Sequence, residues 1–424
     1  MKTIVFIGSC KSGSSCEALR AAEELQYYTV LLTAREPGRM TDFPHAHSVR
    51  VCDIDRIGEV RSAIRQLQMN RLDIRAVVSF IDPYCHTAAV LARELGLRGF
   101  SEAAIAAMQD KIRSRKLLAG TPCTPFFRVA DSPLFTADMA RHLPLVLKSP
   151  VSSSSRDVHR VCTYKQYKAA FERLRAQYPG APVLAEQYLD GPQYLTETLA
   201  ADGRVRIAAV VEQEITYTGR FIITGYRMVT ERDSEPHRSL ETAAASILNA
   251  YGMRDGPCHL ELRRAGGGWG LIEANPRIAG GAMNLFIQTA YGVDLVKETL
   301  KFALGQEPDL TPEFIKEAFL QYVVVPAGGT LVKVTGKQKA QESPGAEHVY
   351  VKPRKGQVLY PPSSMGHRYA YVIATGASAE EARKNARAAA ANIVFHLRPA
   401  GADSGVAAAG DLKAFAGHVA WVRD

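Results

Sequence analysis

The sequence predicts an α/β protein that begins with a Rossmann-like parallel sheet and ends with a small α+β domain. Over residues 1–100, short apolar strands alternate with amphipathic helical patterns, which is typical of a parallel sheet covered by helices. The length of 424 residues predicts two to four domains. A composition with 46% hydrophobic and 22% charged residues is that of an ordinary globular protein.

The first predicted domain takes its strands from "TIVFIG", "YTVLLTA" and "RAVVSFID", with helical patterns between and after them. The loop "GSCKSGSS" (residues 8–15) follows the first strand, where glycines and serines can hold an anion at a helix N-terminus. The loop lacks the full G-x-G-x-x-G pattern, and no acid for a ribose follows at the expected distance. We therefore interpret it as a tight strand-to-helix turn rather than a dinucleotide site.

The middle of the chain begins with a predicted helix over residues 101–120 and a proline-rich connector, "TPCTPFF". The apolar run "LPLVLK" predicts a buried strand, and "KQYKAAFERLRAQY" predicts an amphipathic helix. Further strands are expected at "APVLAEQYLDG" and "RIAAVVEQEI", and a helix at "SLETAAASILNAYG" that ends at Gly252. The strands "GPCHLELRR" and "WGLIEANPRIAGG" are joined by "AGGG", which predicts a hairpin.

The last part of the chain mixes strands with one long helix. Strands are expected in "AFLQYVVVPAGGTLVKVTG", "HVYVKPRKGQVL" and "RYAYVIATG". The segment "SAEEARKNARAAAANIVFHL" has a serine in the N-cap position, acids in its first turn and a long amphipathic pattern, which together predict a helix. Residues 401–424 are rich in alanine and glycine and are interpreted as a tail.

Composition restricts the class of function. No apolar run approaches the roughly 20 residues that span a bilayer, and the N-terminus is interpreted as a buried strand rather than a signal peptide. The seven scattered cysteines contain no C-x-x-C, which favours free thiols in a reducing cytoplasm over a zinc site or a disulfide framework. The net charge of +9 fits either nucleic acid or small anionic ligands. Without a K/R-rich segment or an aromatic RNA-binding motif, small anions are favoured.

The stretch "LIEANPRIAGG" (residues 271–281) carries the main chemical signal. Glu273, Asn275 and Arg277 follow one another at the end of a strand, and Glu261 lies on the preceding strand of the predicted hairpin. Antiparallel pairing would bring the two carboxylates close together. Two carboxylates and an amide suit Mg²⁺, which completes its shell with water and phosphate oxygens. Arg277 would then face an anion beside the metal.

Further cationic and polar groups upstream suit a nucleotide. Lys111 lies early in a helical stretch, and Lys148 ends a buried strand, where its charge needs a partner. The loop that follows contains Ser153, Ser154 and Ser155, whose N–H and hydroxyl donors can close over phosphates. Glu186 and Gln187 lie at a strand end, where they and the backbone can hydrogen-bond an adenine edge.

In the order and spacing of these motifs, the sequence resembles the ATP-grasp carboxylate–amine ligases from about residue 1 to 310. The resemblance implies a two-lobed ATP-grasp fold after the first α/β domain. It implies that Lys111 and Lys148 contact ATP and that Glu186, Gln187, Tyr188 and Leu189 line the adenine pocket. It also implies that Glu261, Glu273 and Asn275 hold Mg²⁺, for which Mn²⁺ can substitute, and that Arg277 and Asn275 act in catalysis.

The sequence departs from the family pattern at two places. Gln193 stands where many members have the glutamate of the ribose contact, and serine replaces glycine in the phosphate loop. The strands and helix over 318–398 resemble, more loosely, the extra domain of the bacterial L-amino-acid ligases. The expected domains are an α/β domain, a small lobe with the phosphate loop, a large lobe with the metal site, a C-terminal domain and a tail, over residues 1–105, 106–190, 191–315, 316–400 and 401–424.

The resemblance implies that a substrate carboxylate attacks the γ-phosphate of ATP and that an amine then attacks the resulting acyl phosphate. The expected substrates are a small carboxylate and a small amine, such as two amino acids. The alternatives are another acceptor (bicarbonate, a thiol, a hydroxy acid or a peptide side chain) and a nucleotide-binding regulatory module. The protein is expected to be cytoplasmic, without nucleic-acid or membrane partners, and a homodimer is left open.

Overall fold

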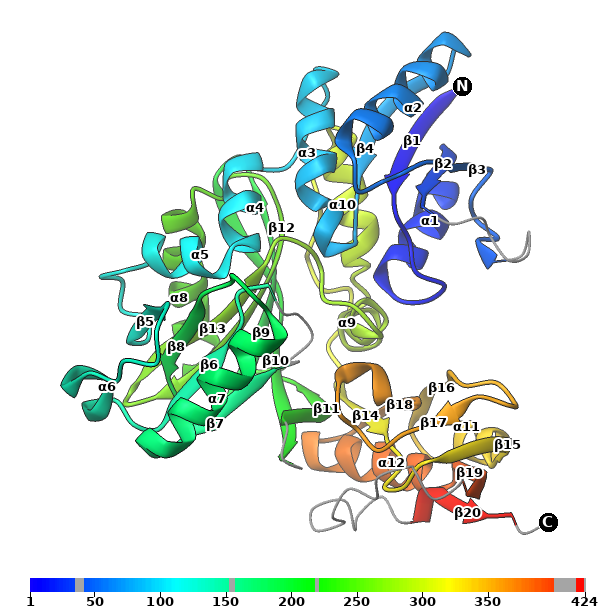
Figure 1. Cartoon of the computed structure of the whole chain (residues 1–424). Helices are drawn as coiled ribbons and strands as arrows, with labels where there is room; N and C mark the ends of the chain where they lie inside the picture. The colour runs from blue at the N-terminus through cyan, green and yellow to red at the C-terminus, as the bar shows by residue number, and fades with distance from the viewer. Residues whose placement is uncertain (35–41, 152–156, 218–220, 400–416, 423–424) are drawn as a thin grey trace. The chain divides into compact units, whose positions relative to one another are not determined.

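The computed structural model describes residues 1–34, 42–151, 157–217, 221–399 and 417–422 (Figure 1). The chain forms two compact units, each built from separate segments of the sequence. Unit 1 comprises Met1–Thr124, Leu195–Val210 and Glu231–Phe314, and unit 2 comprises Pro125–Tyr194, Val211–Thr230 and Ile315–Asp424. No helix in the described residues is long and apolar enough to cross a membrane.

Unit 1 begins with the parallel sheet that the sequence predicts. Its strand order is β3-β2-β1-β4, and a short strand that the sequence analysis did not predict, β3, forms one edge. Helices pack their apolar residues against the sheet around a core that includes Val5, Val30 and Val77. The elements are β1 (Lys2–Ile7), α1 (Ser14–Glu24), β2 (Tyr28–Thr33), β3 (Ser48–Val51), α2 (Ile57–Met69), β4 (Asp73–Val78), the 3-10 helix η2 (Asp82–Tyr84) and α3 (Cys85–Glu94).

The helix expected over residues 101–120 is in fact two helices, α4 (Glu102–Gln109) and α5 (Lys111–Leu117). Asp110 separates them in an extended conformation, and its carboxylate accepts hydrogen bonds from the backbone N–H groups of Ile112 and Arg113. An aspartate in this role begins a new helix. Lys111 is therefore the first residue of α5 rather than a residue inside one long helix.

The rest of unit 1 is a second sheet with strand order β13-β12-β9-β10. Strand β10 belongs to unit 1 as far as Val210 and continues in unit 2. Three helices accompany this sheet, and α8 ends at Gly252 as the sequence predicts. The elements are β9 (Gln193–Ala201), β10 (Arg204–Tyr217), α8 (Glu235–Tyr251), β12 (Gly256–Ala265), β13 (Gly268–Asn275), α9 (Met283–Tyr291) and α10 (Leu295–Ala303).

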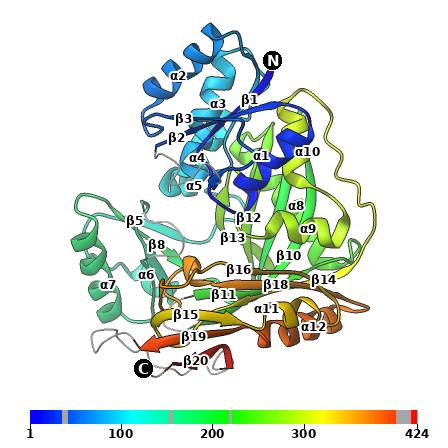
Figure 2. The ribbon, with the colours of Figure 1, turned by 90° about the vertical axis from the view of Figure 1, so that its right-hand side faces the viewer.

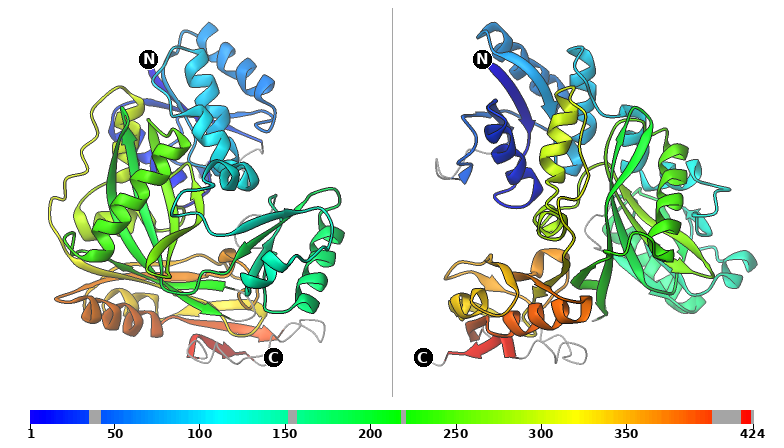
Figure 3. Two further views of the ribbon diagram at one scale, coloured as in Figure 1. Left: turned by 90° about the vertical axis from the view of Figure 1, so that its left-hand side faces the viewer. Right: turned by 180° about the vertical axis from the view of Figure 1, so that it is seen from behind.

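Unit 2 contains a small lobe with a four-stranded antiparallel sheet of order β5-β8-β6-β7. Helix α7 covers one face of this sheet and buries Tyr167, Phe171 and Leu174 there (Figure 3). The side chain of Thr163 caps the start of this helix. The elements of the lobe are β5 (Phe127–Ala130), α6 (Ala137–Arg141), β6 (Leu145–Lys148), β7 (Val158–Val161), α7 (Tyr164–Gln177) and β8 (Val183–Gln187).

The other part of unit 2 has two sheets. The second half of β10 starts one, of order β10-β11-β14-β18-β16, and the other has the order β17-β15-β19-β20. Helix α12 lies along strands β14 and β18 and packs its alanines against them (Figure 2). The elements are β11 (Phe221–Met228), β14 (Glu317–Val323), β15 (Gly329–Thr335), α11 (Lys337–Gln341), β16 (Ala346–Val351), β17 (Val358–Leu359), η3 (Met365–His367), β18 (Ala370–Gly376), α12 (Ala379–Ala391), β19 (Val394–Pro399) and β20 (Val419–Trp421).

Two details of the C-terminal part differ from the sequence expectations. Helix α12 starts after its predicted cap, Ser378, but ends at Ala391, and the following apolar residues form β19. Residues 417–422 of the expected tail contain β20, which pairs in parallel with β19.

Candidate active site

The hairpin of β12 and β13 places the two predicted metal acids opposite each other. Glu261 pairs with Glu273 in the strand register, as the sequence predicts. The turn is made by Gly266 and Gly267, both with positive φ, a conformation that glycine adopts at little cost. An irregularity after Glu261 shifts the register, so that the next pair is Leu262 with Leu271. Both carboxylates therefore lie on the same face of the hairpin.

Helix α5 brings the predicted lysine to this face. The Nζ atom of Lys111 lies 3.4 Å from Oε1 of Glu273. One turn later, Arg115 is buried and donates from Nη2 to the carbonyl oxygens of Leu271 and Ile272, at 2.9 and 2.8 Å. The irregular part of β13 is thus held by a side chain from the helix that carries Lys111.

Asn275 and Arg277 follow Glu273 at the end of β13. Asn275 pairs with His259 in the register and is buried. The backbone then turns, with the Arg277 N–H donating to the Asn275 carbonyl at 2.8 Å. The guanidinium of Arg277 donates from Nη1 to the carbonyl of Ile278 at 3.0 Å and is partly exposed. One edge of the guanidinium is therefore anchored by its own loop.

A buried acid, Glu197, is linked through His259 to one of the predicted metal ligands. Glu197 on β9 is completely buried, and its Oε1 lies 2.5 Å from Nδ1 of His259. Its other oxygen accepts the backbone N–H of Ala279 at 3.2 Å. His259 Nε2 in turn lies 3.4 Å from Oε1 of Glu261. Glu197 thereby connects one predicted metal ligand with the loop that follows Arg277.

The charge state of His259 follows from these contacts. Burial lowers the pKa of His259, but the charge and hydrogen bond of Glu197, together with those of Glu261, outweigh burial and raise it to about 9. The imidazole is therefore protonated at neutral pH, and both ring nitrogens can donate to carboxylates. His259 is thus the link between two acids, Glu197 and Glu261.

These residues fit a divalent ion that arrives with a nucleotide. Among the described residues, no group of three or more His, Cys, Asp and Glu side chains is arranged to hold a metal by itself. Two opposed carboxylates and the amide of Asn275 match the smaller requirement of Mg²⁺, which takes its other ligands from water and phosphate. Lys111, beside Glu273, adds a positive charge to the negative charges of the two carboxylates on this face.

The small lobe of unit 2 holds the other predicted residues. Lys148, at the end of β6, has its Nζ 2.6 Å from Oε2 of Glu186 on β8, and both side chains are at most 10% exposed. The partner that the buried lysine requires is therefore a residue that the sequence analysis assigned to adenine. The adenine contact of Glu186 stays a prediction.

The three residues after Glu186 lie at the end of β8. The N–H groups of Gln187 and Tyr188 donate to the carbonyls of Phe126 and Pro144, each at 2.9 Å. The Tyr188 ring stacks with Phe221 and has the Arg160 guanidinium 4.5 Å from its centroid. These contacts fix the strand end, and Leu189 is largely buried beside it.

The remaining predicted nucleotide-binding residues are Gln193 and the three serines of the phosphate loop. Gln193 is buried at the start of β9. Ser153, Ser154 and Ser155 lie outside the described residues.

The sequence analysis missed Glu197 and Arg115. Both are distant in sequence from the residues they support. The available signal was an acid in the otherwise apolar and small-residue strand "YLTETLAA", because a buried carboxylate requires a partner. Arg115 gave no comparable signal, since an arginine in an amphipathic helix is usually exposed.

Comparison with protein families gives two matches. Residues 141–284 match the ATP-grasp domain, and residues 321–398 match the L-amino acid ligase C-terminal domain 2. The first match includes Lys148, Glu186 and the stretch from Glu261 to Arg277. The second covers most of the C-terminal part of unit 2.

Several known proteins are similar in sequence. The uncharacterized protein y4rH of Sinorhizobium fredii is 26% identical, over 94% of this chain and 84% of its own length. The L-arginine-specific L-amino acid ligase of Bacillus subtilis is 22% identical, over 67% of this chain and 70% of its own. Mouse carnosine synthase 1 is 28% identical over 58% of this chain, which spans about a third (32%) of that longer protein.

The fold is also similar to that of solved structures. The L-amino acid ligase of Bacillus licheniformis has a TM-score of 0.79 at 20% sequence identity, over 93% of this chain and 98% of that one. This likeness extends the shared fold from the N-terminal sheet to the C-terminal domain.

Proposed function

We propose that this chain, an ATP-grasp protein with the C-terminal domain of the L-amino acid ligases, is an ADP-forming carboxylate–amine ligase that joins two amino acids. The observation that carries the proposal is the pairing of Glu261 with Glu273, with Asn275 and Arg277 following on the same strand end. The similarity to an L-amino acid ligase of Bacillus subtilis supports amino acids as both substrates.

ATP-grasp proteins use ATP with a divalent metal, and here the metal is Mg²⁺, for which Mn²⁺ can substitute. Glu261, Glu273 and Asn275 would hold it, and it would supply charge neutralisation at the transferred phosphoryl group. Lys111, which lies beside Glu273, contributes a positive charge to the phosphates. In the small lobe, Lys148 contacts ATP, and the strand end from Glu186 to Leu189 serves adenine.

The reaction has two steps. The carboxylate of the first amino acid attacks the γ-phosphorus of ATP, so that an acyl phosphate forms and ADP leaves. The nitrogen of the second amino acid then attacks the acyl carbon, and phosphate leaves as the amide forms. Arg277 stabilises the oxyanion of the tetrahedral intermediate with the part of its guanidinium that Ile278 does not occupy.

The serine-rich loop with Ser153, Ser154 and Ser155 binds phosphate through N–H and hydroxyl groups, and Gln193 replaces the usual acid at the ribose. The protein acts in the cytoplasm on small molecules, without nucleic-acid or membrane partners. A homodimer is compatible with this activity and is not required by it. The five-part division of the sequence at residues 105, 190, 315 and 400 belongs to the same proposal.

A matrix of amino-acid pairs tests the function. Each pair is incubated with ATP and Mg²⁺, and ADP, phosphate and product mass are measured. We expect ADP and phosphate in equal amounts, and a product with the mass of two amino acids less one water. Glu273→Ala serves as the inactive control. Release of AMP and pyrophosphate, or ADP release without an amino-acid product, would contradict the proposal.

A further inference from the structure

The topology of the N-terminal sheet marks one edge for ligand binding. In the order β3-β2-β1-β4, the chain leaves β1 toward β2 on one side, and β4 lies on the other side. In open parallel sheets, ligands bind at such a switch point, in the crevice outside the carboxyl ends of the strands. The two loops at this point are residues 8–13, after β1, and residues 79–84, after β4.

The first of these loops reaches the end of the motif at residues 271–281. A Cβ atom on Gly13 would lie 3.0 Å from the carbonyl oxygen of Gly281 and 3.1 Å from its nitrogen. Gly13 has a φ of +81°, so a side chain would be strained there in any case. The loops also touch each other, because a Cβ on Gly8 would lie 3.0 Å from the Tyr84 ring. All of these residues belong to unit 1.

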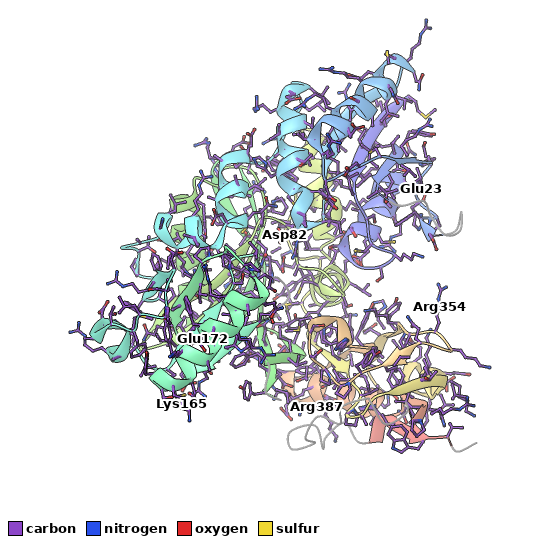
Figure 4. All side chains as sticks on the ribbon, in the orientation of Figure 1. Glu23, Asp82, Lys165, Glu172, Arg354 and Arg387 are labelled. Atoms are coloured by element: carbon purple, nitrogen blue, oxygen red, sulfur yellow. The ribbon has the colours of Figure 1, made fainter. Side chains whose placement is uncertain are left out.

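Asp82 carries a negative charge in the loop after β4. It lies at the foot of α3 (labelled in Figure 4), where it begins η2. Its backbone carbonyl accepts a hydrogen bond from Gln109, but its Oδ1 is buried without a hydrogen-bond partner in the described part of the chain. Leaving a buried carboxylate oxygen without a partner is costly. An unpartnered buried oxygen of this kind needs an explanation, and a bound ligand that donates to it is one.

The charge of Asp82 acts in the same region as that of Arg277. Burial is the main cause that raises the pKa of the Cys85 thiol to about 12, with the charge of Asp82 raising it further and that of Arg277 lowering it. Burial also raises the pKa of the Cys258 thiol, and among the smaller causes the charge of Arg277 lowers it and that of Asp82 raises it. An acid and a guanidinium near the same two thiols match the opposite charges of an amino acid.

We infer that Asp82 binds the protonated amine of an amino-acid substrate at the edge of the sheet where the loops after β1 and β4 meet. The ammonium group donates to Oδ1, which supplies the missing partner of this oxygen. This inference rests on the proposed function and adds a residue that recognises the substrate. The ammonium belongs either to the amino acid whose carboxylate is activated or to the one that attacks it.

The test compares Asp82→Asn with the wild-type chain. Asparagine keeps the size of the side chain but removes its charge. With an equimolar mixture of proteinogenic L-amino acids as the probe, we expect the half-saturating concentration to rise about 10–100-fold, as is typical of losing a hydrogen bond to a charged group. The half-saturating concentration of ATP stays unchanged, and so does the melting temperature. Asp73→Asn, an exposed acid at the opposite end of β4, is the matched control and retains wild-type values.

Hydroxylamine distinguishes the two sources of the ammonium group. It replaces the second amino acid, since its nitrogen bonds to the acyl carbon as phosphate leaves. If Asp82 binds the activated amino acid, the half-saturating concentration for hydroxamate formation rises in Asp82→Asn. If it binds the attacking amino acid, hydroxamate formation is unchanged and only dipeptide formation is impaired.

Unchanged amino-acid saturation in both assays would overturn the inference while leaving the proposed function intact. A lower melting temperature with unchanged saturation would also overturn it, because Asp82 would then be structural. A wild-type chain that releases no ADP with any amino acid would overturn the proposed function and this inference together.

Discussion

Arg277 differs from a lysine in that its guanidinium can make two contacts at once. One edge donates to the carbonyl of Ile278 at 3.0 Å, which leaves the other nitrogens for a developing oxyanion. We expect Arg277→Lys to lower kcat about 10²–10³-fold, the range for losing one oxyanion donor. The half-saturating concentration of ATP should change little. Steady-state kinetics and a melting curve on the same variant check this, and reduced stability with normal kcat would make Arg277 a brace for the loop.

Glu197 is predicted to act through its neighbours rather than on the substrate. It holds His259 and the N–H of Ala279, and His259 reaches Glu261. Glu197→Gln keeps an acceptor but removes the charge, so Glu261 loses part of its orientation. Changes behind a metal ligand typically cost 10–100-fold in affinity or activity, and we expect the half-saturating Mg²⁺ concentration to rise by about that factor.

Two measurements separate this positioning role from a general loss of stability. Excess Mg²⁺ should restore kcat in Glu197→Gln, and the binding of Mn²⁺-ATP, followed by electron paramagnetic resonance, should weaken in parallel. Glu214→Gln is the control, because Glu214 is an acid in ion pairs that belongs to unit 2, whereas Glu197 and the predicted metal ligands belong to unit 1. Normal metal dependence in Glu197→Gln would show that this acid only stabilises the sheet.

Single residues also show where sequence reasoning reaches its limit. The metal acids could be predicted because they lie in two adjacent strands joined by a glycine turn, and local pairing brings Glu261 opposite Glu273. Glu197 could not, because its partners come from distant segments, and Asp82 could not, because the burial of its Oδ1 depends on the packing of the fold. The pairing of Lys148 with Glu186 was half predicted: the need for a partner is a local property of a buried lysine, but its identity depends on the order of the sheet.

At the scale of elements, strongly patterned segments were predicted well and their ends were not. Helices α7 and α8 have clear apolar stripes and were both expected, although α8 begins at Glu235, before its expected start at Ser239. The break at Asp110 was missed because an aspartate between two helical patterns also fits an exposed position in one helix. The end of α12 was missed because its alanine run leads into apolar residues that suit either a helix or a strand.

Strand β20 depends on a buried histidine, and we expect it to be sensitive to acid. His418 lies before β20, and its Nδ1 is 2.9 Å from the carbonyl oxygen of Ile393. Burial lowers the pKa of His418 below the ordinary value of 6.5, although the backbone hydrogen bond opposes this. A lowered pKa means that the neutral form stabilises the fold, so this contribution is complete above about pH 6.5 and is lost as the pH falls below it.

Hydrogen exchange measures this effect. Protection factors, which correct for the intrinsic pH dependence of exchange, should fall in residues 417–422 between pH 7.5 and 5, taken as roughly one unit above and 1.5 below the ordinary histidine value. His418→Gln is a control because it does not titrate in this range, so its protection should be independent of pH. Equal pH dependence in the two chains would mean that another group controls the strand.

At the scale of the whole molecule, the surplus of 52 basic over 43 acidic residues fits an enzyme for anionic substrates, but it does not identify the residues that bind them. The buried pair of Lys148 and Glu186 shows why: the same charges stabilise the small lobe and, in the proposed function, bind the nucleotide. Lys148→Met leaves a buried carboxylate without its partner, which typically costs about 3–5 kcal/mol. Loss of activity in that variant alone would not separate binding from folding.

A double variant separates them. In Lys148→Met/Glu186→Leu both charges are removed, and since replacing a buried ion pair with apolar side chains is often neutral, the melting temperature should return toward that of the wild-type chain. MgATP binds only the folded state and should stabilise the wild-type chain by about 2.7 kcal/mol at a hundredfold excess over its Kd. If Lys148 or Glu186 contacts the nucleotide, the double variant recovers its melting temperature but not this increment. An increment equal to that of the wild-type chain would assign Lys148 to the structure of the small lobe and remove it from the nucleotide site.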